Sequence, residues 1–270
     1  SLHYSLPIYE GESFEENPPT LPDFIRRELR WCQGNMQYFS LLGMDGLKAM
    51  SRMQLFLAIL MYCAPAAWIA FMIAGVGGLF LGGVTIPGTE GAAVPSWLGY
   101  AMLGLVLFMN FAPKILGVVS VLLNRRTAAQ YGGRPRVVAG AAVELSVSML
   151  MAPVVAFAIA IFAAGLGFGS KIDWRAQPRG VRTVDWDEAL RSFAPQTVFG
   201  LALCTCFAVM MPHILFIAAP VIIGLVFAVP FAVLTTNSAV SRWSVRHGIC
   251  AIPEEQDSGQ IAWRDQTASA

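Results

Sequence analysis

The chain has 270 residues, of which 56% are hydrophobic and only 13% are charged, and its formal net charge at pH 7 is +1. An average soluble domain carries roughly 25% charged residues, and a soluble core does not need apolar runs of about 20 residues. These values exclude an ordinary soluble enzyme, and without a basic tract we expect no nucleic-acid partner. The sequence therefore predicts an all-α membrane protein, a multi-span helix bundle with amphipathic interfacial helices.

The N-terminal residues, 1–35, are mostly polar. Residues 1–17 lack the charged start and the apolar stretch of a signal peptide. They read like the interior of a folded domain, so we expect the chain to be the C-terminal part of a longer polypeptide. Two prolines then predict a turn, after which Thr20 is placed to cap a helix.

That helix carries a basic and aromatic cluster. Arg27, Arg30 and Trp31 are spaced i, i+3 and i+4, so we expect them to project from one side. A pair of arginines can neutralise a pyrophosphate through charge-assisted hydrogen bonds, and a tryptophan offers a flat face on which a sugar ring can stack. The alternative is a membrane-proximal helix that contacts lipid headgroups. Gln33 and Asn35 are candidates for contacts with sugar hydroxyls, or equally for capping the end of the helix.

Residues 36–54 have apolar side chains on one stripe and predict an interfacial amphipathic helix. The apolar runs that follow predict a transmembrane region over 55–235. Its expected spans are about 55–83, 98–123, a broken 137–169, 194–211 and 213–235. Arginine-rich segments after the second span and in the tail, 236–270, predict that these parts lie in the cytoplasm.

The third apolar stretch, 137–169, is too long for one ordinary span and too short for two. A single crossing would place the five basic residues between 171 and 191 outside, against the positive-inside rule. We therefore favour a broken or re-entrant helix pair bent at Pro153, which returns the chain to the cytoplasm.

Polar side chains within the apolar runs are costly in lipid and usually face a bundle interior or a cavity. Asn110 and Glu144 are candidates to line a translocation path, although Glu144 fits an interfacial position equally well. Lys114 is better explained as a residue that reaches the interface with its long stem. The five cysteines are scattered and predict no metal site.

At these residues the chain resembles the bacterial glucans biosynthesis glucosyltransferase H family. The resemblance is carried by Asn17-Pro18-Pro19-Thr20, by Arg26-Arg27-Glu28-Leu29-Arg30-Trp31-Cys32-Gln33-Gly34-Asn35 and by Ile252-Pro253-Glu254-Glu255, and it extends over essentially the whole chain. That family is part of the family 2 glycosyltransferases, whose relatives include cellulose and hyaluronan synthases.

The resemblance implies an inner-membrane enzyme that polymerises glucose from UDP-glucose into the β-1,2-glucan backbone of osmoregulated periplasmic glucans and helps to export it. The implied partners are UDP-glucose, the growing glucan, the lipid bilayer and periplasmic glucan-processing proteins. The wider family has a Gln-x-x-Arg-Trp motif at the acceptor end of its catalytic domain. Arg30 and Trp31 match its last two positions, whereas Arg27 replaces the glutamine.

The catalytic residues of that family are not expected in this chain. The family's Asp-x-Asp metal motif and its catalytic base lie upstream of the Arg-Trp motif, and no such motif precedes Arg27. Mg²⁺ or another divalent metal, and a carboxylate base, would then come from a GT-A-like α/β domain that precedes this chain. We expect this chain to be inactive alone.

Two other functions are consistent with the sequence. The first is a non-enzymatic membrane transport or assembly subunit, in which the Arg-Trp cluster is only an interfacial anchor. The second is a family 2 synthase that makes a different polysaccharide.

Overall fold

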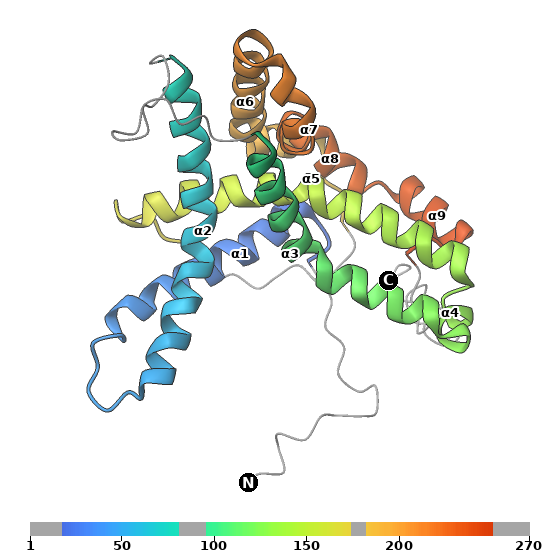
Figure 1. Cartoon of the computed structure of the whole chain (residues 1–270), viewed down its shortest axis with the longest axis horizontal. Coiled ribbons are helices and arrows are strands. Elements are labelled where there is room, and N and C mark those ends of the chain that lie inside the picture. The colour runs from blue at the N-terminus through green and yellow to red at the C-terminus, as the bar shows by residue number, and fades with distance from the viewer. Residues whose placement is uncertain (1–17, 81–95, 174–181, 251–270) are drawn as a thin grey trace.

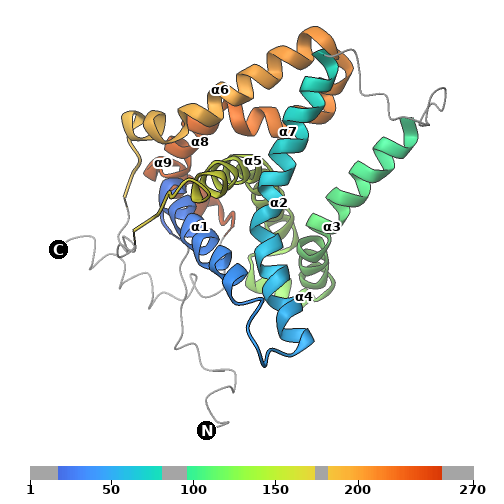
Figure 2. The same cartoon turned by 90° about the vertical axis from the view of Figure 1, so that its left-hand side faces the viewer.

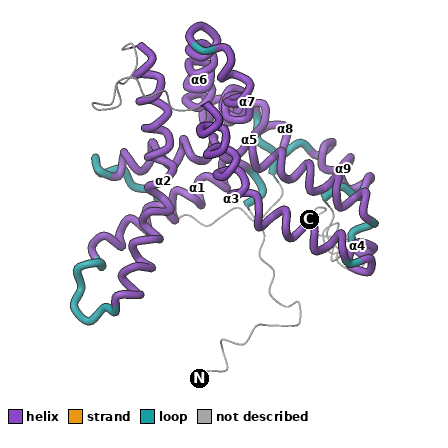
Figure 3. The backbone as a smooth tube through the Cα atoms, in the orientation of Figure 1, coloured by secondary structure: helices purple, strands orange, loops and turns teal. Residues whose placement is uncertain are grey.

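The computed structural model describes residues 18–80, 96–173 and 182–250. Within these ranges 84% of the residues are helical and no strand is present (Figure 3). In chain order the elements are α1 (Leu21–Met36), the 3-10 helix η2 (Gln37–Ser40), α2 (Ala49–Phe80), α3 (Ser96–Leu123), α4 (Arg125–Gln130), α5 (Arg134–Leu166), α6 (Trp186–Met210), α7 (Pro212–Val226), α8 (Ala228–Thr235) and α9 (Ser238–His247).

Four of these helices, α2, α3, α5 and α6, are long and apolar enough to cross a membrane. Together α7 and α8 pass the same test of length and composition, but they are bent by 63° at the break between them. These findings confirm the predicted class of membrane helix bundle. The predicted spans 55–83 and 98–123 overlap α2 and α3, whereas α6 begins at Trp186, ahead of the predicted 194.

The long helix α5 lies between two groups of helices (Figure 1). Figure 2 looks almost along the axis of α5: α2 runs past it from bottom to top, α6 and α7 lie above it, and the first part of α3 lies to its upper right. The helix α1 lies on the opposite side of α5 in both views. α5 therefore crosses the other candidate spans steeply and separates their far ends from α1.

Two buried apolar clusters hold these groups together. On one side of α5 the cluster contains Ile69 of α2, Phe157 of α5, Leu203 of α6 and Leu225 of α7. On the other side, residues of α1, α6 and α8 pack against Val154 of α5. In water, burial of each such side chain would stabilise the fold by about 1.5–3 kcal/mol. Within a membrane, where the helices face lipid, van der Waals packing between the helices provides the stabilisation.

The predicted break at Pro153 is wrong, because α5 continues through this residue without interruption. Proline removes one helical hydrogen bond and crowds the preceding turn, but neighbouring helices can hold the helix together. Here Pro153 is buried and α7 passes directly over it, since a Cβ on Gly224 would lie 2.8 Å from the Pro153 ring. The tight contact with α7 explains why the helix does not open at this proline.

Two further predictions need correction. The expected span 213–235 is divided at Phe227 into α7 and α8. The expected interfacial helix over 36–54 does not form, because η2 ends at Ser40 and turns lead to the start of α2 at Ala49. Gly46 has a φ of 84°, a conformation that other residues rarely adopt and that ends any helix there. The quoted motif 252–255 and the acidic residues before position 18 lie outside the described residues.

Candidate functional site

The helix α1 begins as the sequence predicts. Thr20 is the N-cap, with extended backbone angles, and its hydroxyl accepts a hydrogen bond of 3.3 Å from the Asp23 backbone N–H. Pro22 lies in the first turn, where its missing N–H costs nothing. The same turn carries the acidic Asp23, whose negative charge interacts favourably with the positive N-terminal end of the helix dipole. These local features fix where α1 begins, and with it the positions of Arg27, Arg30 and Trp31 along the helix.

Arg27 and Trp31 form a stacked pair on α1. The guanidinium carbon of Arg27 lies 4.9 Å from the centre of the Trp31 ring and 4.8 Å from the Phe24 ring, and both distances fit a cation–π contact. Arg27 also donates a 3.3 Å hydrogen bond to Glu28. The arginine therefore sits between two aromatic rings, over one face of the tryptophan.

The exposure of the three predicted residues differs. Trp31 is 47% exposed, whereas Arg30 is only 7% exposed and the Arg27 side chain 13%. The structure thus brings Arg27 and Trp31 into contact and places the Arg30 side chain in the protein interior. Trp31 still presents aromatic surface to the outside beside the membrane helices.

Gln33 and Asn35 make contacts within the protein. The Gln33 side-chain oxygen accepts a 2.8 Å hydrogen bond from the Ile172 backbone N–H, which ties α1 to the segment after α5. The Asn35 amide donates to the Trp31 carbonyl at 2.8 Å, on an exposed part of the helix. The capping alternative is wrong, because α1 continues through Gly34 to Met36. Contacts of either side chain with a sugar stay predictions.

A buried polar cluster at the start of α1 was not predicted. The Asp23 carboxylate accepts hydrogen bonds from the Thr20 hydroxyl at 2.5 Å and from Arg182 Nε at 2.9 Å. Arg182 also donates to both oxygens of Glu188 in α6, each at 3.0 Å. Burial alone would raise the pKa of the Asp23 carboxyl, but the hydrogen bonds from Arg182 and Thr20 hold this pKa below its usual value. The cluster joins α1, the chain before α6 and α6 itself.

The polar residues of the candidate spans form local contacts. Lys114 of α3 and Glu144 of α5 are an ion pair with a separation of 2.8 Å, and Lys114 also donates to the Ser148 hydroxyl. The Glu144 side chain is 58% exposed. Asn110 is exposed and donates to the Val106 carbonyl one turn earlier. The pairing of Lys114 with Glu144 across two helices was not predicted.

No group of three or more His, Cys, Asp and Glu side chains lies close enough to hold a metal ion in the described part of the chain. The described residues therefore do not fit the divalent-metal site that family 2 chemistry would use.

Comparison with known proteins identifies homologues along nearly the whole chain. Glucans biosynthesis glucosyltransferase H of Xanthomonas campestris is 32% identical over 97% of this chain, and that of Caulobacter vibrioides is 32% identical over 95%. The protein of the same name from Xylella fastidiosa is 29% identical over 97%. The chain spans only 40–42% of the length of these relatives, consistent with a C-terminal part. No protein-family model and no solved structure matches the chain.

Proposed function

We propose that this chain, a homologue of a part of glucans biosynthesis glucosyltransferase H, is the membrane portion of a processive glucosyltransferase. The polypeptide would polymerise glucose from UDP-glucose into a β-1,2-linked glucan and help to export it. The observation that carries the proposal is the Arg27–Trp31 pair, held on a rigid helix beside the membrane helices.

In this proposal Trp31 stacks the terminal sugar of the growing chain. One face of the indole is covered by Arg27 and the side chain is still 47% exposed, so a sugar ring would use the uncovered face. A stacked acceptor end stays bound while the donor site reloads, and this is the physical basis of processivity. Each new terminal glucose can stack on the indole in the same way, so an aromatic residue suits a chain that must advance.

Arg27 and Arg30 would stabilise the diphosphate of the donor. Arg27 is the nearer of the two to the exposed indole, and its guanidinium has donors in a fixed fork that matches phosphate oxygens. Arg30 is buried, so we assign it the supply of positive charge at short range and the positioning of α1. The residues that hold Mg²⁺ and the catalytic base would lie in a region of the full polypeptide that corresponds to the part of the relatives which this chain does not match.

Export would follow a path that begins beside α3 and α5 at the cytoplasmic side of the membrane. Asn110 on α3 and Glu144 on α5 are both exposed polar groups on otherwise apolar helices, which supports a position next to a polar path. The Lys114–Glu144 pair would keep the path close to neutral. Sugar hydroxyls suit such a lining because they both donate and accept hydrogen bonds.

We infer that α5 lies along the cytoplasmic face of an inner membrane and does not cross it. The residues of α5 from Met151 to Leu166 pack along the length of α1, a helix with five charged residues that lipid would not accept. The arginines before α5 and the basic segment after it then lie on the same side, as the positive-inside rule favours. With α2, α3, α6 and the bent α7–α8 pair as the four crossings, the tail returns to the cytoplasm.

The test uses membranes that contain the full polypeptide, with UDP-glucose as donor. We expect Trp31→Ala to reduce incorporation of glucose into polymer at least about tenfold, since burial of a large apolar side-chain surface is worth about 1.5–3 kcal/mol. Trp31→Phe should keep most activity. Trp97→Ala is the matched control, because Trp97 is a 65% exposed tryptophan on α3.

Equal activity of Trp31→Ala and Trp97→Ala would contradict the acceptor role and favour an anchoring subunit. Incorporation from another UDP-sugar in place of glucose would identify a synthase of a different polymer. Linkage analysis of the product decides the β-1,2 assignment.

A further inference from the structure

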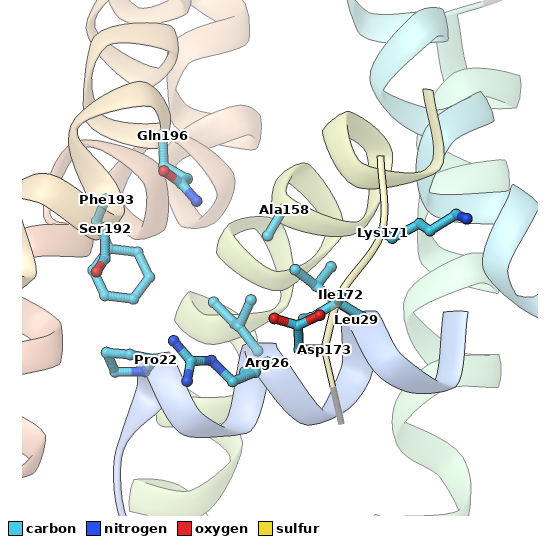
Figure 4. A pocket seen from close by; sticks show the side chains of 11 residues that line it. Pro22, Arg26, Leu29, Ala158, Lys171, Ile172, Asp173, Ser192, Phe193 and Gln196 are labelled. Carbon is cyan, nitrogen blue, oxygen red and sulfur yellow. The ribbon is translucent and has the colours of Figure 1, made fainter. Parts of the chain in front are cut away.

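A cavity of about 550 Å³ opens on the side of α1 that faces α5 and α6 (Figure 4). Its apolar floor includes Leu29 of α1 and Ala158 of α5. Arg26, Asp173, Ser192 and Gln196 supply its polar groups. The volume lies within the range of natural small-molecule sites.

Gln196 is the unusual member of this lining. The residue is 5% exposed, and its side-chain oxygen is buried without a hydrogen-bond partner in the described part of the chain. In Figure 4 its amide points from α6 into the cavity. A buried amide oxygen without a partner costs about 1–3 kcal/mol, and a bound molecule that donates from a hydroxyl group would recover that energy.

The other polar groups favour a neutral ligand rich in hydroxyls. In Figure 4 the Arg26 guanidinium and the Asp173 carboxylate both border the space, whereas the Lys171 side chain points away from it. A guanidinium only donates and a carboxylate only accepts, while the amide of Gln196 and the hydroxyl of Ser192 do both. Hydroxyl groups can hydrogen-bond to each of these groups, because a hydroxyl both donates and accepts. Arg26 and Asp173 carry opposite charges and together leave this part of the lining close to neutral, which favours a neutral ligand over a nucleotide or an anionic lipid headgroup.

The cavity is separate from the Arg27–Trp31 pair. With 100° per residue on a helix, Arg26 and Leu29 point away from Trp31 by roughly 140–160°. We propose that this cavity is a second saccharide site, which binds two or more sugar units of a neutral oligosaccharide through Gln196, Ser192, Arg26 and Asp173. The choice of a saccharide among hydroxyl-rich ligands rests on the proposed function.

The experiment measures binding of a radiolabelled β-1,2-linked glucotetraose to the purified full polypeptide by equilibrium dialysis. All variants carry Trp31→Ala, so that stacking at the acceptor position does not contribute. We expect Gln196→Leu to weaken binding about five- to tenfold. Gln130→Leu, an exposed glutamine on α4, is the matched control and should leave binding unchanged.

A structural role for Gln196 predicts that Gln196→Leu lowers the thermal stability of the protein. If Gln196 serves only to bind a ligand, replacing its unpartnered buried oxygen by leucine removes a desolvated polar atom, so the thermal stability of Gln196→Leu should be unchanged or higher. Weaker binding with unchanged stability therefore supports the site. Unchanged binding, no binding once Trp31 is replaced, or displacement of the sugar by phosphatidylglycerol in mixed micelles would each overturn it. Glucosyl transfer from UDP-glucose with Trp31 intact tests the proposed function separately.

Discussion

Arg182 Nε lies 2.9 Å from the Asp23 carboxylate, although 159 positions separate the two residues in the chain. Asp23 is in the first turn of α1, and Arg182 precedes α6. Because Arg182 also binds Glu188, one guanidinium holds together the helix with the Arg-Trp pair and the start of a candidate span. Together with the apolar packing of α1, this contact holds the helix that carries Trp31 against the membrane helices.

We expect Arg182→Met to destabilise the protein by about 1–2 kcal/mol. Removing one partner of a buried ion pair costs about 3–5 kcal/mol, and we reduce this value because the Arg182 side chain is 33% exposed. Thermal unfolding followed by tryptophan fluorescence measures the change. Arg191→Met is the control, since its ion pair with Asp187 is exposed and should contribute less than about 0.5 kcal/mol. Equal melting temperatures of the two variants would rule out a structural role for the Asp23 contact.

The same contact predicts how acid affects stability. The folded pKa of Asp23 lies below its value in the unfolded chain, so its contribution is fully present above the unfolded pKa and is lost as pH falls through the folded pKa. Unfolding midpoints measured between pH 7 and pH 3 should fall less steeply in Asp23→Asn than in the unmodified protein. A parallel decline of both proteins would exclude this carboxylate as a source of the pH dependence.

Close contact between α5 and α7 depends on a glycine. A Cβ at position 224 would lie 2.4 Å from the Leu150 carbonyl oxygen, closer than any real contact. We therefore expect Gly224→Ala to cost about 1–3 kcal/mol by forcing the helices apart. Gly117→Ala on α3 is matched, because no atom lies within 4 Å of its added Cβ. Melting temperatures of the purified variants measure the loss of stability. An equal loss in Gly117→Ala and Gly224→Ala would contradict a specific role of Gly224 in the contact between α5 and α7.

Local rules were sufficient to predict the site helix. Thr20 caps α1 because its hydroxyl reaches a free N–H in the first turn, and this depends on four consecutive residues only. The contact of Arg27 with Trp31 likewise follows from i, i+4 spacing. The burial of Arg30 and the partner of Gln33 could not be predicted, because each depends on packing against distant parts of the chain.

The failures in the membrane region have a different cause. Pro153 suggested a break, yet α7 packs on it so closely that the helix stays intact. The bend occurs instead at Phe227, a residue without intrinsic helix-breaking chemistry. Since α5 is apolar on all sides, its sequence has no periodicity that would distinguish a crossing helix from one packed between other helices.

Cys32 predicts a change in stability at alkaline pH. Its thiol is fully buried, and this burial, with a further effect of Cys63, raises its pKa to about 11. The folded state therefore keeps its proton above the unfolded pKa of 9.0, and stability falls between pH 9 and 11 by about 2–3 kcal/mol. Chemical denaturation at pH 8 and pH 10.5 should show this decline in the unmodified protein and much less in Cys32→Ala. An identical decline in both would show that other groups are responsible.

The orientation of α5 can be decided by labelling single cysteines in a variant without the five native ones. Ala129→Cys lies before α5 and Ser170→Cys after it, and both positions are exposed. Since α5 is inferred not to cross, an impermeant maleimide should modify neither residue in cells with a permeabilised outer membrane, and both after the inner membrane is opened. Met211→Cys, at the turn between α6 and α7, should react before that step. Reaction of Ser170→Cys together with Met211→Cys would mean that α5 crosses the membrane, and α1 would then have to accompany it despite its five charged side chains.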